Sequence, residues 1–304
     1  MPAATLAGVE RRLREGVRDV RRDAPLARHV AFRIGGPADL LVIPRNVDEL
    51  RAAMRVLIGD GIRPTFIGAG SNVLVGDRGI RGVVVKIGKG VDRVDIVGDR
   101  VTAEAGTGLP ALALRCARAG LAGLEFAAGI PGSLAGSIVM NAGAHGHAME
   151  EVVETAEVIT PDGDRRLDRA ALEFAYRVSV LQHQPWVVIA ATLRLERSDP
   201  TAIVERLNVW LAHRGATQPI GPPSSGCMFR NPPGDHAGRL IDVAGAKGLT
   251  VGGARVSEIH ANYILNDGHA TATDVLALAE QVKARVRDRT GAILEMEVKL
   301  LGEF

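Results

Sequence analysis

One thiol lies in a polar turn of the sequence rather than in an apolar segment. Cys227 is part of SSGCMFRNP (residues 224–232) and comes shortly before Arg230 and Asn231. A buried thiol usually acts as a small apolar residue, whereas a thiol near a cation in a turn can carry chemistry. For Cys227 the residues alone leave three roles open: packing, nucleophile and proton donor. Cys116 lies in an Ala/Leu-rich helical segment, and we expect it in the core.

Two glycine-rich segments could bind a phosphate-bearing ligand. IGAGSNVLV (residues 67–75) follows an apolar strand, and a turn with several backbone N–H groups binds phosphate. It has neither a Walker lysine nor the long helix of a dinucleotide fingerprint. GIPGSLAGSIVMNAGAHG (residues 129–146) is too rich in glycine for a stable helix and too long for a turn. A simple tight turn remains the alternative for the first segment, but the pair suits an extended diphosphate ligand.

Single polar residues add weaker signals. Arg177, in AYRVS, could hold a carboxylate with its planar guanidinium, although a structural role is the alternative. Glu297 lies on the polar side of an alternating closing segment, which a solvated strand face would also explain. His145 and His147 lack a third partner at metal-ligand spacing, so we expect loop surface and no metal.

Composition excludes several classes of function. The chain has 304 residues and a formal net charge of +2, which gives no basic field for nucleic acid or membrane. Aromatic residues make up only 3%, too few for a base-stacking platform. Two cysteines without a CxxC pattern indicate reduced thiols. With no signal peptide and no membrane-spanning run, we expect a soluble cytoplasmic protein that binds no nucleic acid and is not inserted in a membrane.

The elements that must position these residues are both helices and strands. Apolar spacing at Val9, Leu13, Val17 and Val20 predicts a helix over residues 10–23. Further helices are expected over residues 47–59, 109–120, 201–213 and 271–289, and hairpins should turn near residues 98–99 and 161–163. Strands are expected over 186–195 and 293–301. The composition changes near residues 197–200, which indicates an α+β chain of two domains.

Seven segments in order, taken together, resemble the UDP-N-acetylenolpyruvoylglucosamine reductase family. They are FRIGGPADL, IGAGSNVLVGDRGIRGVVV, GLEFAAGIPGSLAGSIVMNAGAHG, FAYRVSVL, SSGCMFRNPPGDHAGRLID, GGARVSEIHANYILN and LEMEVKLLG. The resemblance implies an α+β fold. Residues 1–196 would form a FAD-binding module of the vanillyl-alcohol-oxidase/PCMH type, with two subdomains divided near residue 88. Residues 197–304 would form an α/β domain for a UDP-sugar, and the closing strand 293–301 would return Glu297 to the active site.

The resemblance also implies two cofactors, a non-covalent FAD and NADPH as the electron donor. It assigns the flavin contacts to three segments of the chain. These contacts are Arg33, Gly35 and Gly36; Gly68, Ala69, Gly70, Ser71 and Asn72; and Gly129, Ile130, Pro131, Gly132, Ser133, Gly136, Asn141, Ala142, Gly143 and Ala144.

The implied reaction reduces UDP-N-acetylglucosamine enolpyruvate to UDP-N-acetylmuramate, a peptidoglycan precursor. NADPH would reduce FAD, and flavin N5 would then pass a hydride to the enolpyruvyl carbon. Arg177 and Glu297 match family residues assigned here to polarising and stabilising the enolate. Cys227 stands where the family most often has Ser. Because a thiol, with an ordinary pKa of roughly 8.5, is a stronger acid than an alcohol, we interpret Cys227 as the proton donor. The exchange puts rate and sensitivity to oxidation in question.

Residues for the substrate follow from the same segments. Asn231 matches a residue near the substrate diphosphate, with Arg214 and Arg239 as candidates to pair with that diphosphate. Tyr176, Arg230, His260 and Asn262 complete the expected substrate contacts. The short stretch between AYRVSVL and WVVIA is similar to the shorter form of the family, which lacks an extra Tyr-bearing loop. We expect a monomer. A related flavin oxidase and a catalytically inactive UDP-sugar-binding regulator remain the alternatives.

Overall fold

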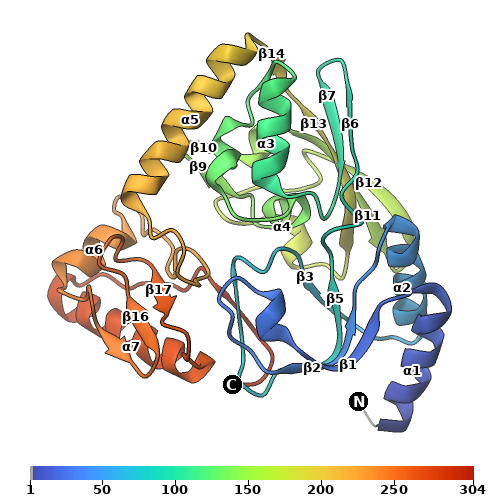
Figure 1. Cartoon of the computed structure of the whole chain (residues 1–304), viewed down its shortest axis with the longest axis horizontal. Coiled ribbons are helices and arrows are strands. Elements are labelled where there is room, and N and C mark those ends of the chain that lie inside the picture. The colour runs from blue at the N-terminus through green and yellow to red at the C-terminus, as the bar shows by residue number, and fades with distance from the viewer. Residues whose placement is uncertain (1–2) are drawn as a thin grey trace. The chain divides into compact units, whose positions relative to one another are not determined.

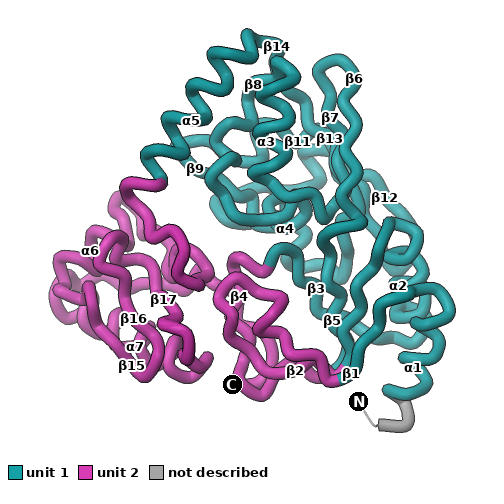
Figure 2. The backbone as a smooth tube through the Cα atoms, viewed as in Figure 1, with its two compact units in different colours: residues 1–22, 40–69, 82–214 teal, residues 23–39, 70–81, 215–304 magenta. Residues whose placement is uncertain are grey.

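The computed structural model describes residues 3–304, and the chain forms two compact units (Figure 2). Unit 1 consists of Met1–Arg22, Leu40–Ala69 and Gly82–Arg214. Unit 2 consists of Asp23–Asp39, Gly70–Arg81 and Gly215–Phe304. Among the described residues, no helix is long and apolar enough to cross a membrane. The domain limits expected from the sequence, 1–196 and 197–304, stay a prediction.

The first layer is a four-stranded sheet with two helices (Figure 1), and three of its four strands have residues in both units. The strands run in the order β1-β2-β5-β3, with β3 parallel to β5. Helices α1 and α2 pack against each other, and their buried leucines and valines share one core with the sheet. Asn46 caps α2 by accepting a hydrogen bond from the Glu49 N–H. The elements are α1 (Ala3–Gly16), β1 (Val20–Pro25), β2 (Pro37–Val42), α2 (Val47–Gly59), β3 (Thr65–Ile67) and β5 (Ile80–Lys86).

The second layer of unit 1 is an antiparallel five-stranded sheet in the order β12-β11-β13-β7-β6. Helices α3 and α4 share a core with this sheet, and Ile203 and Leu207 of α5 join that core. The elements are β6 (Val94–Val97), β7 (Arg100–Glu104), α3 (Leu109–Arg118), β8 (Leu121–Ala122), α4 (Leu134–Val139), β9 (Gly143–Ala144), β10 (His147–Ala148), β11 (Val153–Thr160), β12 (Gly163–Asp168), β13 (Val187–Arg194), β14 (Glu196–Arg197) and α5 (Pro200–Thr217). Strand pairs β8/β14 and β9/β10 stand apart from the sheet.

Unit 2 is built on helices α6 and α7, which share a core with a small sheet, β15-β16-β17. A second pair in this unit, β4 and β18, is parallel. Thr271 and Asp274 form the expected capping box of α7, and Gly291 ends the helix in the left-handed conformation. The elements are β4 (Val73–Val75), α6 (Ala237–Val243), β15 (Thr250–Val251), β16 (Ala254–Val256), β17 (Ile264–Asn266), α7 (Ala272–Thr290) and β18 (Lys299–Leu301).

Three sequence predictions need correction. The helix expected over residues 10–23 ends at Gly16, and Val20 instead begins strand β1. Val20 is buried, as its helical spacing predicted, but it is buried as part of a strand and not of the helix. The second glycine segment contains a short helix, α4, because Ser133 caps it and the neighbouring backbone accepts two of its first N–H groups. The strand expected over 293–301 is shorter than predicted, because β18 covers only Lys299–Leu301, and its Leu300 is 46% exposed whereas Leu294 and Val298 are buried.

Candidate active site

The second glycine segment is anchored by the AYRVS segment of unit 1. The Arg177 guanidinium donates to the Gly143 carbonyl (3.1 Å) and more weakly to the Asn141 carbonyl (3.5 Å). The Asn141 side chain is buried, donating to Ala175 and accepting from Glu150, 3.0 Å in each case. Arg177 has a φ of 59°, a left-handed conformation that is uncommon outside glycine. Such backbone strain fits a residue whose position is set by function.

Gly143 leaves no room for a side chain at this anchor. A Cβ on Gly143 would lie 2.3 Å from the His147 carbonyl oxygen, which is backbone of the paired strand β10. Tyr176 lies beside the Arg177 guanidinium, 5.3 Å from ring centre to Cζ, and is 56% exposed. The sequence-predicted Tyr176, Arg177, Asn141 and Gly143 are therefore brought together in one unit.

The start of the first glycine segment meets the second glycine segment in unit 1. A Cβ on Gly68 would lie 2.4 Å from Ser133 Oγ, so only glycine fits without moving Ser133. The Lys86 ammonium donates to the Gly68 carbonyl from the end of β5. The buried Thr107 accepts the Leu134 N–H with its carbonyl, and its hydroxyl has no hydrogen-bond partner among the described residues. Unsatisfied buried hydroxyls are rare.

Helix α5 lies over the second glycine segment of the same unit. A Cβ on Gly129 would lie 3.0 Å from Arg214 Cδ. The His145 ring stacks on Trp210, with ring centres 4.9 Å apart, and His213 lies at its edge. His145 and His147 are both exposed. Burial lowers the pKa of His145, and His213, His147 and Arg214 lower it further through their positive charges. The sequence placed Arg214 near a substrate diphosphate; the structure places it beside Gly129.

The remaining expected flavin residues, Arg33, Gly35, Gly36 and Gly70, Ser71 and Asn72, belong to unit 2. A Cβ on Gly36 would lie 2.3 Å from the Asp77 carbonyl oxygen, and the Gly36 N–H donates to Gly76. Gly70 has a φ of 72°, and its carbonyl accepts the Ala31 N–H. Asn72 donates from its side chain to the Glu297 carbonyl (3.3 Å). These glycines are required by backbone contact and conformation.

The Cys227 segment contacts two other segments of unit 2 through isolated antiparallel bridges. On one side Cys227 pairs with Tyr263, and on the other side Phe229 pairs with Met296. The Glu297 N–H donates to the Met228 carbonyl (2.8 Å). The structure therefore brings Cys227 and Glu297, which lie far apart in the sequence, into neighbouring segments of unit 2.

Asn262 binds the backbone of this segment with its side chain. Its Oδ1 accepts the Phe229 N–H (2.9 Å), and its Nδ2 donates to the Phe229 carbonyl (2.8 Å). Its own carbonyl accepts the Met228 N–H. Asn262 is 2% exposed, so it holds the Cys227 segment in place through the backbone. His260 Nδ1 accepts the Asn262 N–H (3.2 Å), and burial is the main cause of its lowered pKa.

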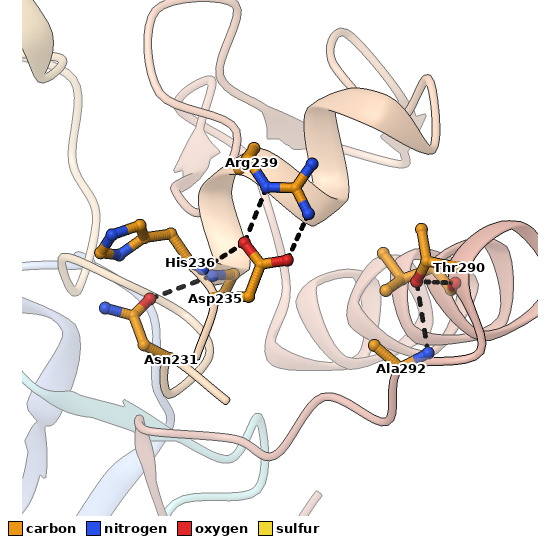
Figure 3. A network of polar contacts seen from close by, with 8 residues as sticks. Asn231, Asp235, His236, Arg239, Thr290 and Ala292 are labelled. Carbon is orange, nitrogen blue, oxygen red and sulfur yellow. Dashed lines mark hydrogen bonds and ion pairs between the residues drawn. The ribbon is translucent and has the colours of Figure 1, made fainter. Parts of the chain in front are cut away.

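Two other expected substrate residues, Asn231 and Arg239, lie at the start of α6 (Figure 3). Asn231 Oδ1 accepts the Ala237 N–H (3.0 Å), which satisfies an otherwise free donor at the helix start. Arg239 forms a forked ion pair with Asp235 and thereby lowers the pKa of that carboxyl to about 2. Arg230 differs, because its buried Nε has no partner among the described residues. A buried donor without a partner marks Arg230 as a candidate for ligand binding.

Comparison with known proteins agrees with this geometry. A family model described as "FAD binding domain" matches residues 38–167, and one described as "UDP-N-acetylenolpyruvoylglucosamine reductase, C-terminal domain" matches residues 218–301. The UDP-N-acetylenolpyruvoylglucosamine reductase of Bacillus subtilis is 45% identical over 280 residues, 91% of this chain and 92% of that protein. The chain belongs to this reductase family. A second such reductase, from Symbiobacterium thermophilum, is 46% identical over 96% of each chain.

A solved structure supports the same assignment. The chain is similar to the crystal structure of the Thermus caldophilus UDP-N-acetylenolpyruvylglucosamine reductase, with a TM-score of 0.80 and 35% identity over 93% of this chain and 98% of that one. The α+β fold, with a FAD-binding domain followed by the family's C-terminal domain, is thereby confirmed. The chain is an oxidoreductase with a flavin-binding domain.

The residues of unit 1 fit a flavin with a diphosphate. Gly68 and Gly143 permit close approach of the backbone, and the Thr107 hydroxyl is buried without a partner among the described residues. Sequence reasoning missed Thr107 and the lysine that contacts Gly68, Lys86. The one signal for Lys86 is a charge that ends the apolar run RGVVVKI. It also missed Trp210, for which helical spacing gave no functional signal.

Proposed function

We propose that the protein reduces UDP-N-acetylglucosamine enolpyruvate to UDP-N-acetylmuramate with NADPH, in the synthesis of peptidoglycan precursors. The observation that carries the proposal is membership of the reductase family over more than nine tenths of the chain. FAD, when bound, supplies the hydride that it takes from NADPH. We also propose that the protein is a cytoplasmic monomer.

The chain's own residues must manage charge and protons. Hydride addition to the enolpyruvyl carbon builds negative charge on the neighbouring carboxylate. Arg177, whose guanidinium is held by the carbonyls of the second glycine segment, would neutralise part of that charge. Glu297 would help to polarise the enolpyruvyl group as that charge develops. Both roles stabilise charge that is larger in the transition state than in the substrate.

Cys227 would complete the reaction as the general acid. Its thiol would give a proton to the carbon next to the carboxylate, and the thiolate would then recover a proton from solvent. The contacts of the Cys227 segment support this role, because the segment is bonded on both sides and Glu297 lies in one of the two neighbouring segments. Arg230, with a buried Nε that lacks a partner among the described residues, would bind the UDP-sugar.

The test is anaerobic NADPH oxidation by the purified protein, with the visible flavin band followed in the same cuvette. We expect NADPH to bleach the flavin and the enolpyruvyl substrate to restore it with sustained NADPH consumption. A flavin that stays bleached until air enters would favour the related oxidase instead. A protein that binds UDP-N-acetylglucosamine enolpyruvate without any flavin would favour the inactive UDP-sugar-binding regulator.

A further inference from the structure

Lys86 is a charged side chain in the interior of unit 1 whose role neither the motifs nor the reaction explains. It ends strand β5, a run whose preceding residues, Val83–Val85, are buried. Strand β5 pairs in parallel with β3, so Lys86 lies opposite Ile67, the last residue before the first glycine segment. The side chain is half-buried, and burial lowers its pKa to about 8. Keeping an ammonium group in this position therefore costs free energy.

The contact of Lys86 is with the backbone of the glycine segment itself. Its Nζ donates to the carbonyl of Gly68. Gly68 in turn is packed against Ser133, since a Cβ at Gly68 would lie 2.4 Å from Ser133 Oγ. Lys86 thus fixes Gly68, the residue at which the first glycine segment meets the second. With its carbonyl held by Lys86, the peptide that follows Gly68 is fixed in orientation.

We propose that Lys86 is a cofactor-positioning residue, which fixes the Gly68 carbonyl at the start of the first glycine segment and places a positive charge there for the phosphates of FAD. Two features support this role over a purely structural one. A methionine or leucine would fill the same interior space without the cost of burying an amine. A positive charge at a backbone loop is also the arrangement that stabilises a bound diphosphate.

The test measures FAD affinity on the purified holoenzyme, by the rise of flavin fluorescence across a dilution series. Three variants are compared with the wild type: Lys86→Met, Lys86→Arg and the matched control Lys89→Met, which removes the same charge from an exposed residue three positions away. We expect Lys86→Met to weaken FAD binding by about 10- to 100-fold, the range for a hydrogen bond to a charged group. Lys86→Arg should stay within about threefold and Lys89→Met should match the wild type.

A second measurement separates this role from general damage to the site. A residue that acts on the phosphates holds oxidised and reduced FAD equally, so Lys86→Met should leave the flavin midpoint potential and visible spectrum unchanged. Wild-type FAD affinity in Lys86→Met would overturn the proposal, and so would a loss of affinity accompanied by a shifted potential. Neither measurement uses the enolpyruvyl substrate, so the outcome is independent of the proposed reaction.

Discussion

The second glycine segment of unit 1 and the Cys227 segment of unit 2 are positioned by different means. The glycine segment is held by close backbone packing, with Gly143 against the His147 carbonyl and the Arg177 guanidinium on the Gly143 carbonyl. The Cys227 segment is held by backbone hydrogen bonds to Asn262 and Glu297 and, in addition, by the buried Asn262 side chain, which forms two hydrogen bonds with the Phe229 backbone. We therefore expect an added side-chain atom to disturb the glycine segment most, and the loss of the Asn262 hydrogen bonds to disturb the Cys227 segment most.

The largest effect is expected from Asn262→Ala, which removes both hydrogen bonds to Phe229. The N–H and carbonyl of Phe229 would remain buried without partners, at a cost of about 2 to 4 kcal/mol in the free energy of unfolding. Urea denaturation measures this loss. Asn262→Asp buries a carboxylate whose second oxygen faces the Phe229 carbonyl, so it should destabilise the protein at least as much as Asn262→Ala. An exposed asparagine, Asn208, supplies the control substitution to Ala.

The same variant should change the reactivity of one thiol. Burial raises the pKa of Cys116 to about 12, so alkylation by iodoacetamide reports on Cys227. Because about 1.4 kcal/mol corresponds to a factor of ten, local opening of the strand in Asn262→Ala should speed alkylation by at least about tenfold. FAD affinity should stay at the wild-type value. If FAD affinity fell while the alkylation rate stayed constant, the two regions would not be positioned as described.

Gly143→Ala should give the opposite pattern. Its Cβ would press on the His147 carbonyl, a backbone atom that cannot move aside cheaply. Overpacking of this kind costs about 1 to 3 kcal/mol. The resulting backbone shift would also move the Gly143 carbonyl, which accepts the Arg177 hydrogen bond. We expect weaker FAD binding and normal Cys227 alkylation. Gly59→Ala, where nothing lies within 4 Å of the new Cβ, is the matched control; equal effects at both glycines would contradict the packing argument.

The smallest effect concerns pH and His260. Burial lowers the pKa of His260 below its ordinary value, so the unfolded chain takes up the proton more readily than the folded one. The stability that neutral His260 supplies is therefore present above about pH 6.5 and is lost as the pH falls through the lower folded pKa. His260→Gln should flatten the decrease in thermal stability between pH 7 and 5. The exposed His269 provides the control, and its substitution by Gln should leave the slope intact.

The sequence predicted the contacts of the glycine segments better than those of the Cys227 segment. Glycine content and loop length pointed to two segments whose glycines make close backbone contacts in the structure, because close approach requires glycine; their binding of the cofactor stays a prediction. The helices over residues 47–59 and 271–289 and both hairpins were also predicted, since capping and turn residues act locally. The helix expected over 10–23 was wrong, because Val20 is buried by a strand whose partners lie elsewhere in the sequence.

Asn262 and Lys86 show the limit of reading a sequence. Asn262 was assigned to substrate through its motif, and only the fold reveals that both ends of its amide bind Phe229. Lys86 lies 18 residues from the carbonyl it contacts, and no spacing rule joins them. Both residues act through long-range pairing, which depends on the register of strands that the sequence does not state.

We propose that Cys227 serves the reduction of the enolpyruvyl substrate and not the reduction of the flavin by NADPH. Stopped-flow absorbance on Cys227→Ala measures both halves separately under anaerobic conditions. We expect NADPH to bleach the flavin at the wild-type rate, while the return of the flavin band on addition of the enolpyruvyl substrate slows by about 10²- to 10⁴-fold, as expected for loss of a general acid. Cys227→Ser should recover part of that loss. An equal slowing of both halves, or no slowing of either, would contradict the role of Cys227 as proton donor.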